Sequence, residues 1–580
     1  MPGFLGYAGE VEKSNLFSKS ENHIDNLLTE NIRSNGFFLE RRTIKKFLND
    51  KLFVETDQFF VLLEGTIFKI DDLCKKYNRA EFLNTIMEMY HKNGDAFFIE
   101  FRGTFSGVLF DKRKNKKIIF TDHIGDKQVF FHQTKGFFLF GSELNYLVEY
   151  FKNNDLNYSF NENAAYFLLT FGYMLEDNTL FNEFKKLQAG HYILIEGNTV
   201  SIHQYYQLDN TPKDELTEEE IIENVDSLFR QATKRQFDKD KEYGYNHLVA
   251  LSGGLDSRMT TWVANDLGYG ENIVNFTFSQ SDYDDETIAK EIARDLKHEW
   301  IFKFLDNGLC LKNLEQVLKI TSGNCIYSGQ SHGKSALDLI DKSNFGILHS
   351  GQLGDVILGT YSSEPKHIPY TLFDGVYSRK YIKRLDKSVI KRNYPNQELF
   401  KMYQRGFNGI NQGLLPMQES METFSPFYDI EFLEFCFHIP VELRFNHYIY
   451  FKWIQKKYPE AAKYKWEILR GKITETKVTI RGHLILLRRL PIVVMQYYLN
   501  KLGFKVFPIN TKNHMNPFDY WYNTNEDLKI FMDEYYHENI ESLDSYTPLK
   551  KDCKDLYTKG SASEKTQVLT LLAFLKLNFG

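Results

Sequence analysis

The residues whose types and order best suit ligand binding are Ser252-Gly253-Gly254-Leu255-Asp256-Ser257. They follow an apolar run, HLVAL, at 247–251. The run has the length and composition of a buried strand, and the residues after the glycines have the pattern of a helix. Glycines between a strand and a helix let the backbone approach a phosphate, and the helix N-terminus directs free N–H groups toward it. Ser252 and Ser257 add hydroxyl donors, and Asp256 adds a carboxylate suited to Mg²⁺. We therefore predict a phosphate-binding loop rather than an ordinary glycine-rich turn.

A second candidate loop, SGQLGDVILG at 350–359, follows a predicted strand at 345–349. We expect Ser350 and Gly351 to face the first loop across a bound nucleotide. Asp256 alone could be a helix N-cap and Asp355 alone a turn residue. Together, on two loops that should face each other, they predict a shared Mg²⁺ site, because this ion prefers hard oxygen ligands. Three apolar residues are candidates for lining the adenine, with simple core packing as the alternative: Val249, Leu251 and Phe278.

The elements around these loops alternate between strands and helices. A capping box, Thr217 with Glu220, starts a helix before the first loop, and strands are predicted at 273–278 and 300–305 with a helix at 284–296 between them. This alternation indicates a doubly wound parallel sheet, in which ligands bind at the carboxyl ends of the strands. Both loops lie at such ends. Asp284, Asp285 and Glu286 begin a helix, where acids favour the dipole, and we give that explanation more weight than a catalytic one.

The first 200 residues are β-rich instead. Short apolar runs at 58–65, 95–101, 107–111, 117–122 and 136–142 predict stacked antiparallel sheets. The polar stretch LDNTPKDEL at 208–216 is the expected linker. The sequence thus predicts a β-rich domain at 1–207 and an α/β domain at 217–580 with a helical C-terminal part.

Several stretches resemble known proteins. The segments at 101–131, 137–144 and 180–195 are similar, in order and spacing, to the N-terminal glutaminase domain of asparagine synthetases. The SGGLDS loop resembles the pyrophosphate loop of the ATP-pyrophosphatase superfamily. The resemblance implies a four-layer αββα N-terminal-nucleophile fold followed by an α/β synthetase domain. It also implies ATP and Mg²⁺ as cofactors, and an acyl-adenylate that an amine opens to an amide, with release of AMP and pyrophosphate.

The synthetase loops depart from the family pattern. Gln352 stands where the family has a glutamate, and Val356 replaces a second acid, whereas Asp355 is kept. Loss of the glutamate removes a candidate general base, which suggests a substrate other than aspartate or a weakened enzyme. Gln330, Ser331 and His332, placed just before the helix that precedes the second loop, are candidates for binding the acyl substrate. An ordinary surface position is the alternative for His332.

The family's catalytic lysine is harder to place. Counted from Pro459, its position falls on Glu467, and the preceding arginine falls on Lys465. We assign the charge-neutralising role to Lys465, with Lys472 and Lys452 as rivals. A lysine in a charged stretch is more often only solvated.

The resemblance also predicts that the N-terminal domain has no glutaminase activity. The family uses a cysteine at residue 2 as nucleophile, where this chain has Pro2, and Cys74 is interior. Glu64 falls where the family has an oxyanion-hole asparagine, so a negative charge stands where an oxyanion must form. The acid that holds the glutamine amine falls on Arg79, although Arg41 could still match the carboxylate clamp.

Composition narrows the remaining classes. The chain has 580 residues, 42% hydrophobic and 16% aromatic, with a net charge of −6 and five cysteines. These values predict a packed globular protein in a reducing, cytoplasmic compartment that does not bind nucleic acid. No signal peptide is evident. The lipophilic segment 482–502 is broken by Arg488, Arg489 and Pro491, so we expect no membrane span, and a core helix rather than an amphipathic surface helix.

We therefore expect an asparagine-synthetase-like ligase that joins a small-molecule or peptide carboxylate to an amine or ammonia. A homodimer is compatible with this expectation. Asparagine synthesis from aspartate with free ammonia, intramolecular lactam or macrocycle closure, and a degenerate nucleotide-binding scaffold remain as alternatives.

Overall fold

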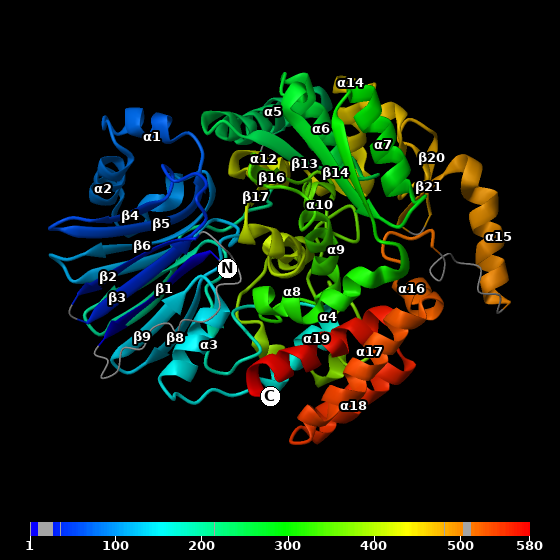
Figure 1. The fold of residues 1–580 in the computed structure, drawn as a ribbon. Coiled ribbons are helices and arrows are strands. Elements are labelled where there is room, and N and C mark those ends of the chain that lie inside the picture. The colour runs from blue at the N-terminus through cyan, green and yellow to red at the C-terminus, as the bar shows by residue number, and fades with distance from the viewer. Residues whose placement is uncertain (1, 10–26, 35, 214, 481, 503–511) are drawn as a thin grey trace.

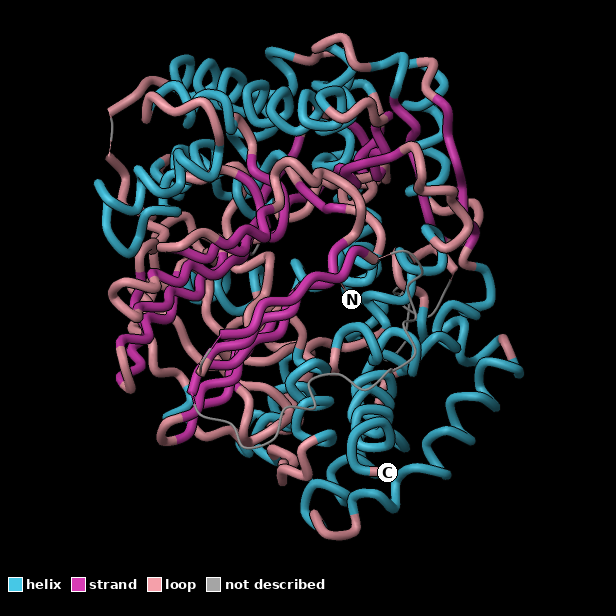
Figure 2. The backbone as a smooth tube through the Cα atoms, turned by 60° about the vertical axis from the view of Figure 1, so that its left-hand side comes forward, coloured by secondary structure: helices cyan, strands magenta, loops and turns pink. Residues whose placement is uncertain are grey.

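The computed structural model describes residues 2–9, 27–34, 36–213, 215–480, 482–502 and 512–580. In its N-terminal half, two antiparallel sheets of six strands each lie face to face (Figure 2). The first sheet has the order β10-β8-β9-β1-β3-β2 and the second β12-β11-β7-β6-β5-β4. The strands are β1 (Gly3–Gly9), β2 (Leu28–Ser34), β3 (Phe37–Thr43), β4 (Leu52–Glu55), β5 (Phe59–Ile67), β6 (Gly103–Asp111), β7 (Lys116–Thr121), β8 (Phe130–Thr134), β9 (Phe137–Gly141), β10 (Lys185–Lys186), β11 (His191–Glu196) and β12 (Thr199–Gln204).

Alternation along these strands builds a four-layer sandwich. In β5, Phe60 and Leu62 enter the core between the sheets, whereas Val61 and Leu63 face the helices outside. Successive strand residues point to opposite faces, so each sheet can bury both surfaces. Helices α1 (Ile70–Lys76) and α2 (Phe82–Asn93) cover the second sheet, and α3 (Leu144–Asn153) covers the first, with α4 (Glu162–Phe171) in the same hydrophobic core farther from the strands (Figure 1). The predicted αββα arrangement is confirmed.

One predicted strand is wrong. Residues 95–101 lie mainly in a 3₁₀ helix, η1 (Gly94–Glu100). Phe97, Phe98 and Phe101 all enter the same outer core, against the second sheet. A strand would send the neighbours Phe97 and Phe98 to opposite faces, whereas a tight helical turn can bury both on one side.

The second half is built on a parallel sheet of five strands in the order β15-β14-β13-β16-β17. Its strands are β13 (Asn246–Ala250), β14 (Ile273–Ser279), β15 (Glu299–Phe304), β16 (Phe345–His349) and β17 (Glu422–Phe424). Helices α5 (Glu218–Glu242), α6 (Leu255–Asp266) and α7 (Asp284–Leu296) pack on one face, and α9 (Ser328–Leu337) packs on the other. Helices on both faces of a parallel sheet confirm the doubly wound prediction. Thr217 and Glu220 form the predicted capping box at the start of α5.

The C-terminal helices join the two halves. They are α17 (Glu526–Asn539), α18 (Thr547–Lys559) and α19 (Ala562–Phe579), and α19 packs both on α8 (Leu314–Thr321) and on α4 of the N-terminal half. Gln567 of α19 also donates a 2.9 Å hydrogen bond to the carbonyl of Leu168 in α4. One hydrophobic core therefore contains residues from both sides of the predicted boundary, and the domain limits 1–207 and 217–580 stay a prediction.

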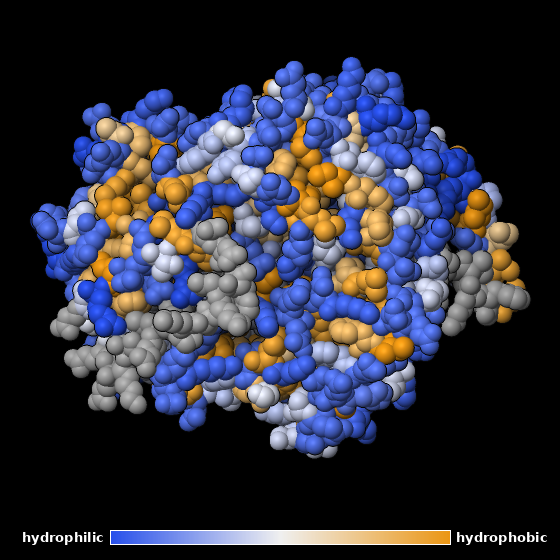
Figure 3. All heavy atoms as spheres, viewed as in Figure 1, coloured by the Kyte–Doolittle hydropathy of each residue, from blue (hydrophilic) through white to orange (hydrophobic). Residues whose placement is uncertain are grey.

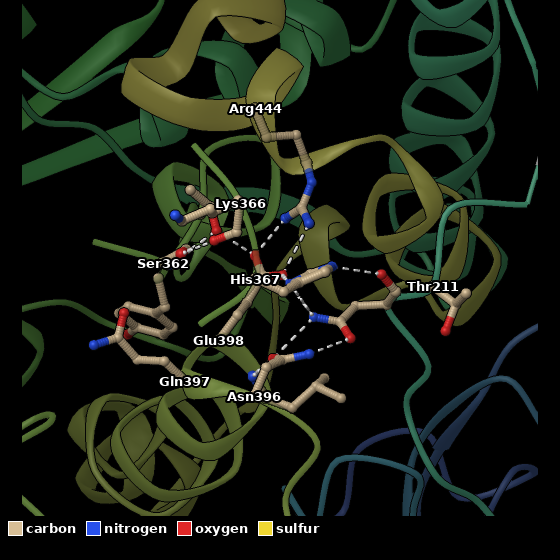
Figure 4. A network of polar contacts seen from close by, with 12 residues as sticks. Thr211, Ser362, Lys366, His367, Asn396, Gln397, Glu398 and Arg444 are labelled. Atoms are coloured by element: carbon tan, nitrogen blue, oxygen red, sulfur yellow. Dashed lines mark hydrogen bonds and ion pairs between the residues drawn. The ribbon is translucent and has the colours of Figure 1, made fainter. Parts of the chain in front are cut away.

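The predicted linker at 208–216 is anchored by a buried ion pair. Glu398, in α11 (Gln397–Lys401), accepts a 2.9 Å hydrogen bond from Nη2 of Arg444, and both side chains are buried. Asn210 of the linker donates to the same carboxylate at 2.8 Å, and His367 contacts the carbonyl of Asn210 at 3.0 Å. Figure 4 shows this network. The linker is thus held by side chains from the second half.

The lipophilic segment at 482–502 does not form a core helix. It contains α15 (Leu490–Lys501), and no side chain that the structure describes in this helix is buried. The expectation of a core helix is therefore wrong. Of this segment, Leu486 before the helix is buried in the core of the second half, whereas α15 itself buries no described side chain. No helix within the described ranges is long and apolar enough to cross a membrane.

The network in Figure 4 gives a prediction about stability. Glu398→Ala leaves the Arg444 guanidinium buried without its carboxylate, so we expect the free energy of unfolding to fall by about 3–5 kcal/mol. Urea denaturation followed by circular dichroism measures the change. Glu364→Ala is the control, because the Glu364–Lys366 pair is exposed and should contribute less than about 1 kcal/mol. Equal effects of the two substitutions would contradict the prediction.

Candidate functional site

The first loop closes on itself through its serines. It connects the end of β13 to the start of α6 at Leu255, with Gly254 as the N-cap. The amide of Ser252 donates to Oγ of Ser257 at 3.0 Å, the two serine hydroxyls lie 2.9 Å apart, and the amide of Gly254 donates to Oγ of Ser252 at 3.1 Å. The loop is therefore shaped before any ligand arrives, and the first turn of α6 leaves its N–H groups directed outward.

Two side chains that sequence reasoning did not select for the site brace this loop. Asp285, at the start of α7, accepts a 2.8 Å hydrogen bond from the amide of Gly253, and burial raises the pKa of this carboxyl to about 6. Arg258 is fully buried and donates to the carbonyls of Gly253 at 3.1 Å and Ala461 at 3.2 Å, and to that of Lys465. Asp285 thus does more than complement the helix dipole, and Arg258 joins the loop to the chain segment near residue 465.

The second loop lies against the first, as predicted, because β16 pairs directly with β13. It leads into the short helix α10 (Gly354–Ile357). A Cβ atom on Gly351 would lie 2.3 Å from the amide nitrogen of Ser257, and one on Gly354 would lie 2.7 Å from Cγ of Asp256. Glycine at both positions therefore permits the approach of the two loops.

The carboxylate of Asp256 is held at this contact. Its Oδ2 accepts the amide of Asp355 at 2.8 Å, and its Oδ1 accepts the hydroxyl of Tyr450, in α14 (Tyr448–Lys457), at 2.9 Å. Desolvation, and then repulsion from the Asp355 carboxylate, keep the pKa of Asp256 well above its ordinary value. Two carboxyl groups that destabilise each other's charge are suited to a divalent cation, which would relieve that repulsion.

Gln352 faces a tyrosine and not the Asp256–Asp355 contact. Its Oε1 accepts the hydroxyl of Tyr428 at 2.8 Å, and its carbonyl accepts Oγ of Ser425 at 3.1 Å. The side chain is only half-buried. The amide therefore orders the second loop through neutral hydrogen bonds, and it offers no basic oxygen of the kind that the family's glutamate supplies.

The lysine segment presents a carboxylate to the loop. Oε1 of Glu467 lies 3.7 Å from the position that a Cβ on Gly254 would take, and its Oε2 is buried without a hydrogen-bond partner among the described residues. Burial, followed by the nearby charge of Asp285, raises the pKa of Glu467 to about 8. Lys465 is exposed, and within the described ranges its ammonium makes no hydrogen bond or ion pair.

The rival lysines lie at the surface. Lys452 forms an ion pair with Glu218 at 3.5 Å, with both side chains partly exposed. Lys472, in β19 (Gly471–Lys472), is also exposed. Neither lysine has a contact with the two loops in the described structure, so the geometry does not favour them over Lys465.

The apolar candidates for the adenine pocket are mostly core. Val249 and Leu251 are 0% and 2% exposed, and they pack against helices beside the sheet. Phe278 is half-buried, with its ring 6.4 Å from that of His332. Of the three, only Phe278 has a surface that a ligand could contact.

The three substrate candidates lie inside α9 rather than in a loop before a helix. His332 is buried against the rings of Phe518 and Trp521, and its Nε2 has no hydrogen-bond partner among the described residues. Burial lowers the pKa of His332 to about 4, so the ring is neutral. Gln330 donates to the carbonyl of Gln412 at 3.0 Å, and Ser331 bonds within its own helix. The surface position expected as the alternative for His332 is therefore wrong.

One group of three potential metal ligands occurs within the described ranges: Asp240, His247 and His349. All three are fully buried, and Oδ2 of Asp240 lies 3.0 Å from Nδ1 of His247 and 2.8 Å from Nε2 of His349. These are hydrogen-bond lengths, in which both imidazoles donate to one carboxylate. We interpret the group as a tie between α5, β13 and β16 rather than a metal centre.

A small cavity of about 30 Å³ lies between the halves, with Pro2, Glu64 and Ser142 in its lining. Space of this size holds one or two water molecules. Glu64 is buried and accepts Oγ1 of Thr43 at 2.9 Å, and it pairs with Arg41 at 3.3 Å. Arg41, which we predicted could bind the carboxylate of a substrate, therefore already binds a carboxylate of the protein itself.

The other two residues of the glutaminase comparison lie away from this cavity. Arg79 is at the surface, where it bonds Glu88 at 2.6 Å. Cys74 lies in α1 and accepts Oγ1 of Thr85 at 3.2 Å. No cysteine lines the cavity in the part of the chain that the structure describes.

The same cavity is crossed by an ion-pair network between the halves. Glu422, on β17, lies 2.9 Å from Nζ of Lys51 and 2.6 Å from Nζ of Lys127. Although burial opposes its ionisation, the charges of Lys127 and Lys51 lower the pKa of Glu422 to about 2. The second half thus inserts a charged carboxylate between two lysines of the first.

These features define a class: an N-terminal-nucleophile-type sandwich joined to a doubly wound α/β sheet with two loops at its carboxyl edge. Comparison with known families agrees. Residues 49–206 match the glutamine amidotransferase domain family, and residues 224–463 match the asparagine synthase family. The chain belongs to the asparagine synthetase family.

The chain is also similar to individual members. It is 26% identical to asparagine synthetase [glutamine-hydrolyzing] 2 of Bacillus subtilis, over 45% of this chain and 36% of that protein. It is 23% identical to a putative asparagine synthetase [glutamine-hydrolyzing] 2 of Methanocaldococcus jannaschii, over 54% of this chain and 62% of that protein. The alignments therefore span less than two thirds of either relative. Amidase chry2 of Gibberella zeae is 26% identical over 30% of this chain and 25% of its own length.

The contact between the loops gives a second prediction. Gly351→Ala places a methyl group against the backbone of Ser257, so we expect the loops to separate and ATP affinity to fall at least tenfold, at a cost of about 1–3 kcal/mol in stability. Calorimetric titration with ATP measures the affinity. Gly329→Ala in α9 is the control, because nothing lies within 4 Å of a Cβ there. Unchanged affinity in Gly351→Ala would contradict the prediction.

Proposed function

We propose that the protein is an ATP-dependent ligase that forms an amide through an acyl-adenylate. The observation that carries the proposal is the pair of loops, SGGLDS and the loop of Asp355, joined by the hydrogen bond between the Asp355 amide and Asp256. Membership of the asparagine synthetase family, whose members use ATP, supports the same conclusion. The carboxylate and the amine are not named by these observations.

In the proposed reaction, a carboxylate oxygen of the substrate bonds to the α-phosphorus of ATP as the bond to the bridging α–β oxygen breaks. Pyrophosphate leaves, and the amine then attacks the acyl carbon, loses a proton and releases AMP. The first turn of α6, with Ser252 and Ser257, would bind the departing pyrophosphate through N–H and hydroxyl groups. Asp256 and Asp355 would hold Mg²⁺, which supplies positive charge to the phosphates when bound. Tyr450 would keep the Asp256 carboxylate oriented.

The identity of the cleaved bond tests the proposal. We expect AMP and pyrophosphate as products, and carboxylate-dependent exchange of labelled pyrophosphate into ATP across a panel of amino acids, peptides and uronic acids. Asp256→Asn and Asp355→Asn should each lower the exchange at least about 100-fold without unfolding the protein, because charge stabilisation at the phosphates is lost. ADP and phosphate as products would contradict the proposal. Normal exchange in either variant would show that the substituted residue does not belong to the site.

Lys465 is the proposed source of positive charge for the reaction of two anions. The contact between Arg258 and the Lys465 carbonyl, which fixes the backbone beside the first loop, supports this role, and so does the free reach of its exposed side chain. We expect Lys465→Ala to lower turnover about 100- to 1000-fold while ATP affinity changes little. Steady-state kinetics and ATP titration separate the two effects. Lys472→Ala and Lys452→Ala are the matched controls. If turnover fell only in one of these two variants, the positive charge would be assigned to that lysine instead.

We also propose that the N-terminal half does not hydrolyse glutamine, so that the amine is free ammonia or part of the substrate. Pro2 in the cavity lining and Glu64 paired with Arg41 support this view, because a buried acid opposes an oxyanion. We expect no glutamate release from glutamine, with or without ATP and the acyl substrate, whereas ammonium salts sustain amide formation. Glutamine-dependent rates comparable to the ammonia-dependent rates would overturn this assignment.

One observation favours a second candidate, a nucleotide-binding scaffold without turnover. The carboxyl group of Glu467 lies beside the first loop, where the family has a lysine, and it supplies no positive charge to a transition state rich in negative charge. Such a scaffold would bind ATP but show no pyrophosphate exchange with any carboxylate of the panel. Exchange with even one carboxylate would exclude it.

A further inference from the structure

Many large apolar side chains are exposed on α15 and on the β-hairpin that precedes it. The hairpin consists of β20 (Lys477–Ile480) and β21 (His483–Leu486), and α15 stands apart from the body of the molecule at the right of Figure 1. Hydrophobic residues are visible at the same edge in Figure 3, among hydrophilic ones. Met495 is 56% exposed and Tyr498 60%. Other large apolar residues here that are at least 40% exposed are Ile480, Leu487, Ile492, Val494, Tyr497 and Leu502.

The apolar surface of α15 is not confined to one side. Ile492, Val494 and Met495 are all exposed. At 100° per residue, Ile492 and Met495 point only about 60° apart, whereas Val494 points about 160° away from Ile492, so the exposed apolar side chains cover a broad arc of the helix. A globular partner would bury one stripe of a helix and leave the opposite face polar. Apolar residues on several sides instead suit a helix whose surroundings are themselves apolar over much of its circumference.

The charged side chains that residues 476–518 contribute are all basic. From residue 476 to residue 518 the sequence has no Asp or Glu, although the chain as a whole carries a net charge of −6. Arg488 pairs with Glu475, which lies just outside the stretch, while Lys501 at the end of α15 is exposed. The seven basic residues of the stretch are Lys477, Arg481, Arg488, Arg489, Lys501, Lys505 and Lys512. Lys512 lies 3.7 Å from Asp282, which belongs to another part of the second half. An apolar surface whose own segment carries only basic charges complements an anionic lipid surface.

The length of α15 fixes how it could meet a bilayer. Twelve residues span about 18 Å, well short of the roughly 30 Å hydrocarbon layer, so the helix cannot cross it. It can lie along the interface with its apolar side chains among the acyl chains. Arg488 and Arg489 at one end and Lys501 at the other would then meet the headgroups, and Tyr498 belongs to a residue type enriched at this depth.

We propose that α15 and the β20–β21 hairpin dock the protein onto the surface of a membrane that contains anionic lipids. The docking is peripheral and does not depend on the ligase chemistry proposed above. It places the α15 edge of the second half against the bilayer and leaves the two loops as they are.

Flotation of the full chain with lipid vesicles tests the proposal. We expect the protein to float with vesicles of equal phosphatidylcholine and phosphatidylglycerol at 100 mM NaCl, but not with phosphatidylcholine alone. Met495→Ser/Tyr498→Ser should lower the partition coefficient at least tenfold, because two apolar side chains are lost. Lys501→Gln should lower it about fivefold through the loss of one charge. The matched control is Leu339→Ser/Phe373→Ser, at residues that are 70% and 57% exposed elsewhere.

Circular dichroism and thermal unfolding should show that all of these variants are folded. A change of less than twofold in the control pair, together with weaker binding at 500 mM NaCl, would support the proposal. It would be overturned by absence of binding to the anionic vesicles, or by equal losses in the control pair. A lipid-independent dimer that Met495→Ser/Tyr498→Ser dissociates in light scattering would also overturn it, because the surface would then belong to a second copy of the chain.

Discussion

The candidate site depends on the close approach of two loops at the carboxyl edge of one sheet. Because β13 and β16 are neighbouring parallel strands, the segments that leave them emerge side by side. Gly351 and Gly354 let the backbones come together without the clash that a Cβ would cause. The amide of Asp355 then fixes the carboxylate of Asp256. A single distance between two strands thus decides whether two acids, from residues 99 positions apart, can act on one ligand.

Local signals in the sequence were sufficient to predict many helices and strands, but not the surfaces against which these elements pack. The predicted helix at 284–296 and strand at 345–349 have the observed limits, because caps and apolar runs are local properties. The capping box of Thr217 is an example of the same kind. The errors at 95–101 and 490–501 arose where tertiary packing decides. An apolar run can turn onto one core, as in η1, or stay at the surface, as in α15.

The residues around Asp256 show the limit of a motif. SGGLDS marks the loop, but Tyr450, which binds Asp256, is 194 positions away, and no spacing rule connects the two. Arg258 follows the motif directly, yet its contacts with the carbonyls of Ala461 and Lys465 depend on how a distant segment folds back. Counting from Pro459 put Glu467 at the position of the family's lysine, and the structure places the carboxyl group of Glu467 beside the loop, whereas the side chain of Lys465 is exposed.

The junction of the halves has a consequence for the history of the gene. Glu422 belongs to the sheet of the second half, but Lys51 and Lys127, which neutralise it, belong to the first. A lineage that lost the first half would leave this carboxylate without its partners at a newly exposed surface, and a partial loss that kept it buried would cost about 3–5 kcal/mol. Two residues farther along, Phe424 accepts the amide of Ser350 in the second loop. The second loop is therefore linked through β17 to the sandwich, which gives that fold a structural role separate from any chemistry of its own.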